Sequence, residues 1–543
     1  MNANTEKWII SGGPIITMND NQPLVEAVGF QGELITSVGN LEVVKEIMGD
    51  KYIVIDLKGK TLLPGFIDSH IHVVGNLFYY FNLNLSNIKS LKEIQDLLKS
   101  TIKQKKKGEF ILGLNLDEQK FFNPNERVLP TRWDLDQVSP DNPVFLLRHD
   151  VHLGIANTRA LELAGIDINT EAPEGGTIQK KDGKITGILV ENATNLMMSK
   201  YTLPDKEVLT NAASRAFKDL AKKGITSVHT LLEHDRKGGV EGLGGIAIPL
   251  LQSIEELILQ NVYCLIYTAR PKRLKKIKKP PLDSGNKYGK IKVGGLKSWF
   301  DGTFGSSSAY LFEPFADQSN NKGFLVIDEQ ELYERMKEAH NLGFQIAIHA
   351  IGDKANRILV DLYKKLLLES PREDHRHRIE HASILTPDVI KDMKDLGLIG
   401  SCQPAFINSE YDYLEKRIGK ERCKYTYPYK SLIDAGIIIA GGSDCPVEDS
   451  SVIMGLHALV TRNGFVPEQC ISIKDALKIY TINGAYASFE EDIKGSIEKG
   501  KLADFVILDK NPLETPIDEI KNIQVLETMI RGKTVFKKNI ENH

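Results

Sequence analysis

Apolar and polar positions alternate along the middle of the chain in two different periods. Short apolar runs are separated by segments such as residues 329–343 and 353–370, whose apolar side chains fall at helical spacing and which end in helix stop signals. Strands that alternate with helices are typical of α/β folds with a parallel sheet. We therefore predict barrel strands near residues 62–70, 225–231, 262–268, 292–299, 344–349, 376–380, 398–402 and 437–443. Eight strands in this arrangement predict a (β/α)8 barrel of the TIM type.

The two ends of the chain follow a different pattern. Residues 7–57 alternate short β-rich runs with turns, and the polar stretch 19–23 separates two of these runs. Similar runs return near the C-terminus at residues 501–509 and 525–538. We therefore expect β-rich structure outside the barrel at both ends.

The connection after the first predicted strand is too long for an ordinary loop between a strand and a helix. Residues 73–210 are expected to form an inserted subdomain, with a β-hairpin around Asp182-Gly183. Because this insertion follows a strand end at the catalytic face of a barrel, we expect it to act as a lid and to determine specificity. The predicted domains are 1–60 and 492–543 for the β-rich ends, 61–72 and 211–491 for the barrel, and 73–210 for the insertion.

The segment PGFIDSHIH, which ends in His70 and His72, carries the first candidate chemistry. Pro64-Gly65 opens a strand-like segment, and successive side chains of a strand alternate between its faces. The two imidazoles therefore point the same way and could converge on one divalent metal ion. The spacing alone is weak, because a chain with 13 histidines contains such a pair by accident fairly often.

Four further segments each follow an apolar run with groups that can bind a metal ion. These groups are His349, the trio His375, His377 and His381, Asp444, and Lys297. Of the trio, His375 and His377 are expected to be polar positions around the sixth strand rather than ligands. Polar side chains just beyond the carboxyl ends of buried strands are where (β/α)8 barrels build their active sites. The joint pattern is therefore much stronger than any single motif.

These segments resemble the amidohydrolase superfamily, and specifically the YtcJ-like amidohydrolase family 3, which includes N-substituted formamide deformylases. PGFIDSHIH resembles the metal motif of the superfamily's first strand, and GGLKSWFDGTFGSSSAYL resembles the segment that bears a carboxylated lysine. IAIHAIGDKAN, RIEHASI and GGSDCPV resemble its later His, His and Asp segments, and the similarity runs nearly end to end. The resemblance implies a small β-sandwich formed by both chain ends and the metal ligands His70, His72, Lys297, His349, His381 and Asp444.

Imidazoles and carboxylates suit zinc and similar divalent ions, and the resemblance implies two of them. A protonated lysine has no lone pair, so Lys297 could serve only after carboxylation by carbon dioxide, which yields a carbamate that can bridge two cations. Such a centre would supply a metal-activated hydroxide and polarise the substrate carbonyl, with Asp444 as the general base. The expected ligands are His70, His72 and Asp444 for one ion and His349 and His381 for the other.

Other candidate residues have weaker support. The family carries an Asp-Gly-His pattern at Asp150 and His152, so His152 is a second catalytic candidate that would orient substrate, although Val151 replaces the glycine. Glu191 matches the family at a position of unknown role. His229 could face the barrel interior, where a hydrogen-bonded core histidine is favoured over a third-metal ligand.

Length and composition permit this architecture and exclude others. A chain of 543 residues is too long for a single core and is expected to divide into domains. With 41% hydrophobic and 26% charged residues, it has the composition of an ordinary globular protein. The 69 basic and 72 acidic side chains give a net charge of −3, which argues against a general nucleic-acid-binding surface.

The cysteines and the N-terminus indicate a cytoplasmic protein. The five cysteines are scattered without CxxC spacing and are odd in number, so neither a disulfide framework nor a structural zinc knuckle is expected. Residues 1–10 lack the features of a secretory signal, and no apolar run approaches the roughly 18 residues of a membrane helix. We therefore expect no membrane partner.

The sequence predicts a metal-dependent amidohydrolase that cleaves a non-peptide C–N bond, with the amide of a small N-acyl or N-formyl compound as the first expectation. A deaminase or a cyclic-amide hydrolase on the same barrel is the alternative within enzyme chemistry. A noncatalytic sensor or assembly protein is the alternative from another class, disfavoured because the whole ligand set is retained. The expected partner is a small-molecule amide, with no nucleic acid, and a homodimer is left open.

Overall fold

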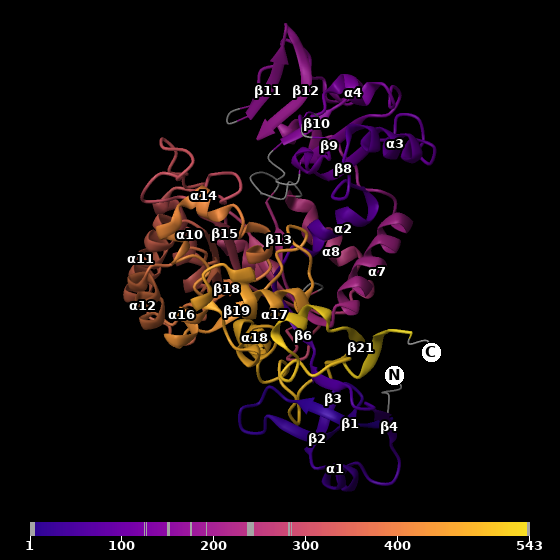
Figure 1. The fold of residues 1–543 in the computed structure, drawn as a ribbon, viewed down its shortest axis with the longest axis vertical. Coiled ribbons are helices and arrows are strands. Elements are labelled where there is room, and N and C mark those ends of the chain that lie inside the picture. Colours follow the sequence, from indigo (N-terminus) through magenta and orange to yellow (C-terminus); the bar gives the residue numbers. More distant parts are fainter. Residues whose placement is uncertain are drawn as a thin grey trace. The chain divides into compact units, whose positions relative to one another are not determined.

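The computed structural model describes residues 6–123, 125, 127–148, 153–173, 176–191, 193–235, 244–280, 283 and 285–539 (Figure 1). The chain forms two compact units. The smaller is built mainly from residues 75–213, and the larger contains the preceding residues and most of those that follow. The larger unit carries a barrel and a sheet made from both chain ends.

Eight parallel strands form the barrel, and their order in space is their order in the sequence. They are β6 (Phe66–Ile71), β13 (Ile225–Glu233), β14 (Asn261–Tyr267), β15 (Ile291–Trp299), β16 (Gln345–Ala350), β17 (Arg378–His381), β18 (Ile399–Cys402) and β19 (Ile439–Gly441). The barrel is nearly closed between β19 and β6, where the N–H of Asp444 donates to the carbonyl oxygen of His70 at 2.7 Å. The prediction of a mixed α/β fold with an eight-stranded parallel barrel is confirmed.

The first barrel strand begins later than predicted. Leu62 and Leu63 belong to β5 (Thr61–Pro64), which pairs with β1 and β20 of the terminal sheet. The chain passes from one sheet to the other at Gly65, where a Cβ would lie 2.2 Å from Cγ2 of Thr226. An apolar run indicates a buried strand but does not tell which sheet that strand joins.

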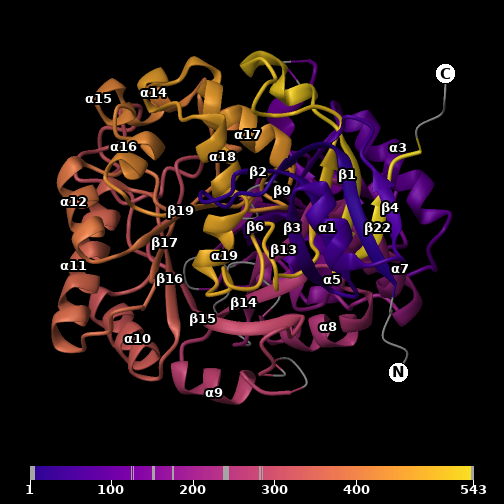
Figure 2. The same ribbon diagram turned by 90° about the horizontal axis from the view of Figure 1, so that it is seen from below.

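Helices cover the outside of the barrel, and Figure 2 shows α10, α11 and α12 outside β15, β16 and β17. α10 (Glu329–Asn341) begins after the N-cap Asp328 and buries Leu332 and Met336, whereas α11 (Asp353–Glu369) buries Leu359 and Val360. Further helices of the larger unit are α1 (Leu41–Met48), α8 (Ala247–Ser253), α9 (Leu274–Ile277), α12 (Pro387–Asp395), α13 (Phe406–Glu410), α14 (Leu414–Ile418), α15 (Lys420–Cys423), α16 (Tyr429–Asp434), α17 (Val452–Thr461), α18 (Ile473–Ile479) and α19 (Ile482–Ala487).

Strands from both chain ends form one sheet in the order β22-β21-β20-β5-β1-β2-β3, with β4 beside β1. β5 connects the two ends, because it lies antiparallel to β20 and parallel to β1. Phe30 and Phe505 pack in the hydrophobic core of this terminal sheet, with ring centroids 5.8 Å apart. The strands are β1 (Lys7–Ile16), β2 (Leu24–Gln31), β3 (Leu34–Gly39), β4 (Ile53–Asp56), β20 (Phe505–Leu508), β21 (Val525–Ile530) and β22 (Lys533–Lys537).

The smaller unit contains a six-stranded sheet in the order β11-β12-β10-β9-β8-β7. The predicted hairpin is confirmed, because β11 and β12 pair antiparallel around Asp182 and Gly183, which have φ of +50° and +70°. Phe121 is buried in the core of this unit, whereas Phe122 is 76% exposed. The strands are β7 (Leu83–Asn84), β8 (Ile111–Leu116), β9 (Val144–Arg148), β10 (Leu153–Ala156), β11 (Gly176–Lys181) and β12 (Lys184–Glu191). The helices of this region are α2 (Val73–Phe81), α3 (Leu91–Ile102), α4 (Arg132–Asp136), α5 (Thr158–Ala164), α6 (Thr194–Met198) and α7 (Lys206–Lys222).

In the described part of the chain, no helix combines the length and the apolar character needed to cross a bilayer. All five cysteines are free thiols, four of them buried.

Candidate metal centre

The six predicted ligands lie at or just beyond the carboxyl ends of barrel strands. Five of them are at most 6% exposed, and His72 is the more accessible one. Parallel strands direct their carboxyl ends to one edge of a barrel, which is where such barrels carry out chemistry. His70 lies in β6, His72 follows β6, Lys297 lies in β15, His349 lies in β16, His381 ends β17, and Asp444 follows β19.

Five of these residues form one cluster. Oδ1 of Asp444 lies 2.9 Å from Nε2 of His72 and 3.3 Å from Nε2 of His70. One ligand atom from each of His70, His381 and Asp444 lies within 4.8 Å of the other two. The ring centroid of His381 lies 4.9 Å from that of His70 and 4.4 Å from that of His349. The structure therefore brings four imidazoles and a carboxylate together.

Left-handed backbone holds two members of this cluster in place. The φ angle is +70° at His381, +46° at Ala382 and +59° at Asp444. Residues with a Cβ rarely adopt such angles, and those that do are concentrated at functional sites. The turn before Asp444 also packs closely on β6, since a Cβ at Gly442 would lie 2.4 Å from the backbone nitrogen of His70. Asp444 is thus held beside His70 at a cost in backbone strain.

Lys297 is buried and close enough to the cluster to be affected by the charge of Asp444. Its Nζ has no hydrogen-bond partner among the residues that the structure describes. Burial lowers the pKa of Lys297 to about 8, although the negative charges of Glu380 and Asp444 oppose the change. An amine with this pKa is partly neutral near pH 7, and the neutral form is the one that can react with carbon dioxide.

Glu380 is a residue that the sequence analysis did not single out. Its Oε2 contacts Nδ1 of His70, and its Oε1 pairs with Nε of Arg378 at 2.7 Å. Burial opposes ionisation, but the charges of Arg378 and His70 hold the pKa of Glu380 well below its usual value. Metal-binding histidines usually present their second ring nitrogen to such a carboxylate, which orients the ring. The available signal was a carboxylate inside a buried strand, one residue before His381.

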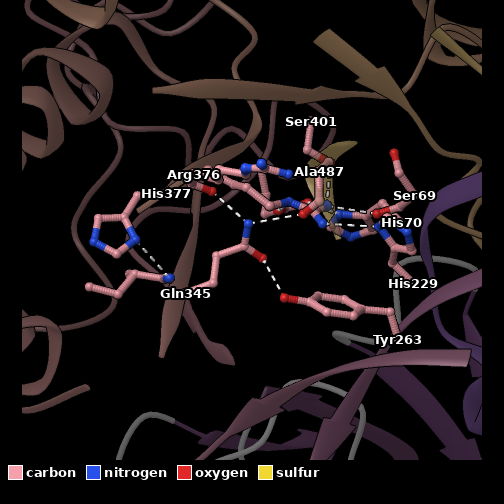
Figure 3. A network of polar contacts seen from close by, with 12 residues as sticks. Ser69, His70, His229, Tyr263, Gln345, Arg376, His377, Ser401 and Ala487 are labelled. Atoms are coloured by element: carbon pink, nitrogen blue, oxygen red, sulfur yellow. Dashed lines mark hydrogen bonds and ion pairs between the residues drawn. The ribbon is translucent and has the colours of Figure 1, made fainter. Parts of the chain in front are cut away.

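A buried polar network inside the barrel includes Ser69, Ser401 and His229 (Figure 3). Arg378 donates to the carbonyl oxygen of Ser69 at 2.7 Å and to Oγ of Ser401 at 2.8 Å, and its Nη1 lies 3.1 Å from Nδ1 of His229. The His229 ring packs against Tyr263 with centroids 5.2 Å apart, and burial holds its pKa well below the usual value. His229 is therefore a neutral, hydrogen-bonded core residue.

His375 and His377 belong to a separate chain of histidines that also includes His340. Every ring nitrogen of the three has a protein partner, so none remains for a metal ion. The contacts are His340 Nδ1 to His377 Nε2 at 2.9 Å, His340 Nε2 to Ser370 O at 2.8 Å, His377 Nδ1 to Ile346 N at 3.1 Å, His375 Nε2 to Leu396 O at 2.8 Å, and His375 Nδ1 to His377 N at 2.9 Å.

The cluster fits a divalent metal ion of the zinc type. Imidazole nitrogens and a carboxylate oxygen are the ligands that such ions prefer. Burial lowers the pKa of His72, that of His349 to about 3, and that of His381 well below its usual value, so these rings are neutral, the form that binds metal. Nδ1 of His381 is buried and has no hydrogen-bond partner within the described ranges.

The three weaker candidates from the sequence are Asp150, His152 and Glu191. Asp150 and His152 lie outside the described residues. Glu191 ends β12 in the smaller unit and has φ of +51°.

Comparison with known proteins relates the whole chain to one group of hydrolases. The model of the Amidohydrolase family matches residues 53–536. The putative amidohydrolase YtcJ of Bacillus subtilis is 29% identical, with 98% of this chain and 100% of that protein covered. The N-substituted formamide deformylase of Arthrobacter pascens is 28% identical, with 96% and 97% covered. A solved structure of an uncharacterized metal-dependent hydrolase from Pyrococcus horikoshii is 28% identical, with a TM-score of 0.76 and with 94% and 99% covered.

Proposed function

Because this chain belongs to the amidohydrolase family, we propose that it hydrolyses a non-peptide C–N bond, the amide of a small N-acyl or N-formyl compound. The observation that carries the proposal is the cluster of four imidazoles and Asp444 at the carboxyl end of the barrel. A relative that matches nearly the whole chain is named for deformylating N-substituted formamides, which supports this class of bond.

The residues of the cluster would hold two divalent ions, with zinc the first candidate. His70, His72 and Asp444 would bind one ion, and His349 and His381 the other, with carboxylated Lys297 between them. Ions bound there would acidify a water molecule and polarise the substrate carbonyl. In carboxylation, Nζ of Lys297 forms a bond to the carbon of CO2 and loses a proton, which leaves a carbamate with the negative oxygens that an ammonium lacks.

Asp444 is the residue proposed to move protons. Burial opposes its ionisation, but the His70 and His72 rings hold its pKa well below the usual value, so it is present as the carboxylate that a base requires. Its carboxylate takes a proton from the attacking water and later delivers it to the leaving nitrogen. The amide is thereby converted to an amine and a carboxylic acid.

A substrate screen tests this proposal. Metal-loaded protein is incubated with N-formyl amines, N-acyl amines and cyclic amides, and the products are identified by mass spectrometry, with chelator-treated protein as the control. Release of an amine and an acid from N-formyl or N-acyl amines is expected. Turnover of cyclic amides alone would instead identify a cyclic-amide hydrolase, and release of ammonia from an amino-substituted heterocycle added to the screen would identify a deaminase. No turnover of any compound would favour a noncatalytic protein.

A further inference from the structure

Gln403 carries a buried amide without a partner at the catalytic end of the barrel. It directly follows β18 and is 1% exposed. Neither Oε1 nor Nε2 has a hydrogen-bond partner in the part of the chain that the structure describes. Buried polar groups are nearly always paired, because an unpaired group has lost its water without replacement. An exception at the functional end of a fold indicates a ligand that completes the pairing.

Gln345 is a buried glutamine of the same barrel whose side-chain amide is fully hydrogen-bonded. It is also 1% exposed, but it lies at the opposite, amino end of a strand, at the start of β16. Its Nε2 donates to the carbonyl oxygens of Arg376 at 2.6 Å and Ala487 at 3.0 Å, and its Oε1 accepts from the hydroxyl of Tyr263 at 3.1 Å (Figure 3). The barrel can satisfy a buried amide completely, and at Gln403 it does not.

The position of Gln403 relates it to the metal-ligand cluster. Ser401 in β18 accepts a hydrogen bond from Arg378 within the barrel. Side chains alternate along a strand, so Gln403, two residues further on, continues this inward face toward the carboxyl end. One turn later, the N–H of Phe406 donates to the carbonyl oxygen of Gln403 at 3.1 Å, and the Phe406 ring stacks on His381 with centroids 6.0 Å apart.

We propose that Gln403 binds the substrate, with Oε1 accepting a hydrogen bond from the N–H of the amide that is cleaved. This role of Gln403 rests on the proposed function. It restricts the expected substrates to secondary amides, because a tertiary amide has no N–H to donate. A site built to hydrogen-bond one group rejects the analogue that lacks it, since the buried polar atom of the site is then left unpaired.

The test compares N-butylformamide with its tertiary analogue, N-butyl-N-methylformamide. Metal-loaded wild-type protein is expected to prefer the secondary amide. Gln403→Met, which has similar volume, should lower kcat/KM for the secondary amide about 10- to 100-fold and leave the tertiary amide nearly unaffected. Equal losses for both substrates, or no loss, would overturn the assignment. If the wild-type protein cleaves no amide at all, the proposed function itself is wrong and the role of Gln403 falls with it.

Thermal unfolding separates substrate binding from a structural role. Gln403→Met loses no bond within the protein, so its Tm should be unchanged or higher. The matched control, Gln345→Met, should lower the Tm because it leaves the Tyr263 hydroxyl and two carbonyls unpaired, yet it should keep the preference for the secondary amide. A fall in Tm for Gln403→Met as large as that of the control would overturn the proposal. Gln403→Leu gives the same comparison if Gln403→Met does not accumulate.

Discussion

At the scale of single residues, the buried amine of Lys297 is the group on which a two-ion centre depends most. Lys297→Ala should lose metal and activity, because the carbamate that we propose as the bridge between the ions can no longer form. Acetate or propionate should partly restore both by occupying the space of the lost carbamate, whereas Lys297→Arg should stay inactive because a guanidinium does not carboxylate. Metal content and turnover with and without the added acid provide the measurement. A fully active Lys297→Ala protein would rule out carboxylation.

Glu380 is expected to hold the ring of His70 in the orientation that metal binding requires. Glu380→Gln should weaken metal affinity about 10- to 100-fold, the usual effect of removing such a carboxylate. Competition with a chelator measures the affinity, and Glu369→Gln at the exposed Lys337 ion pair serves as the matched control. Wild-type affinity in Glu380→Gln would show that Glu380 serves only to neutralise Arg378.

The residues that sequence alone could and could not reveal differ in a physical way. Two recognisable motifs after apolar runs contain His70, His72 and Asp444. The structure brings these three residues together. Glu380 lies within the RIEHASI segment beside His381 but was not recognised there as a site residue, and Gln403 belongs to no such segment. The significance of Glu380 comes from a contact with β6, and that of Gln403 from the absence of any partner among the described residues, and both depend on the folded arrangement.

At the scale of elements, apolar runs located the barrel strands because each is buried and bounded by polar turns. They could not assign β5 to the terminal sheet, since pairing with β1 and β20 depends on a segment more than 400 residues away along the chain. The hydrogen-bonded chain of His340, His377 and His375 could not be predicted from the sequence either. It ties α10 to the start of β17 and the loop before β18 through bonds between residues far apart in sequence.

This histidine chain predicts loss of stability in mild acid. Burial lowers the pKa values of all three rings, so the folded protein keeps them neutral while the unfolded chain takes up protons below about pH 6.5. Their contribution to stability is therefore fully present above about pH 6.5 and is lost as the pH falls. Urea midpoints of metal-loaded protein should decline below this pH, and more steeply in the wild type than in His340→Gln. Parallel curves for the two proteins would contradict this account.

At the scale of the whole molecule, we assign metal binding and substrate specificity to two different regions. The barrel carries the metal-ligand cluster, and we propose that the inserted unit, built mainly from residues 75–213, adds specificity for the part of the substrate away from the amide. Phe122→Ala should then change the relative kcat/KM for short and long N-acyl chains without changing metal content. Proportional losses for all substrates would leave specificity to the barrel loops around Phe304 and Phe406.

The central claim is a centre with two divalent ions, and the metal content of the protein tests it most directly. The cluster of His70, His72, His349, His381 and Asp444, together with Lys297, offers more ligands than one tetrahedral ion needs. Elemental analysis of purified, chelator-free protein should approach about two divalent ions per chain, as two-ion hydrolytic sites require. A firm value of one ion or none would contradict the account.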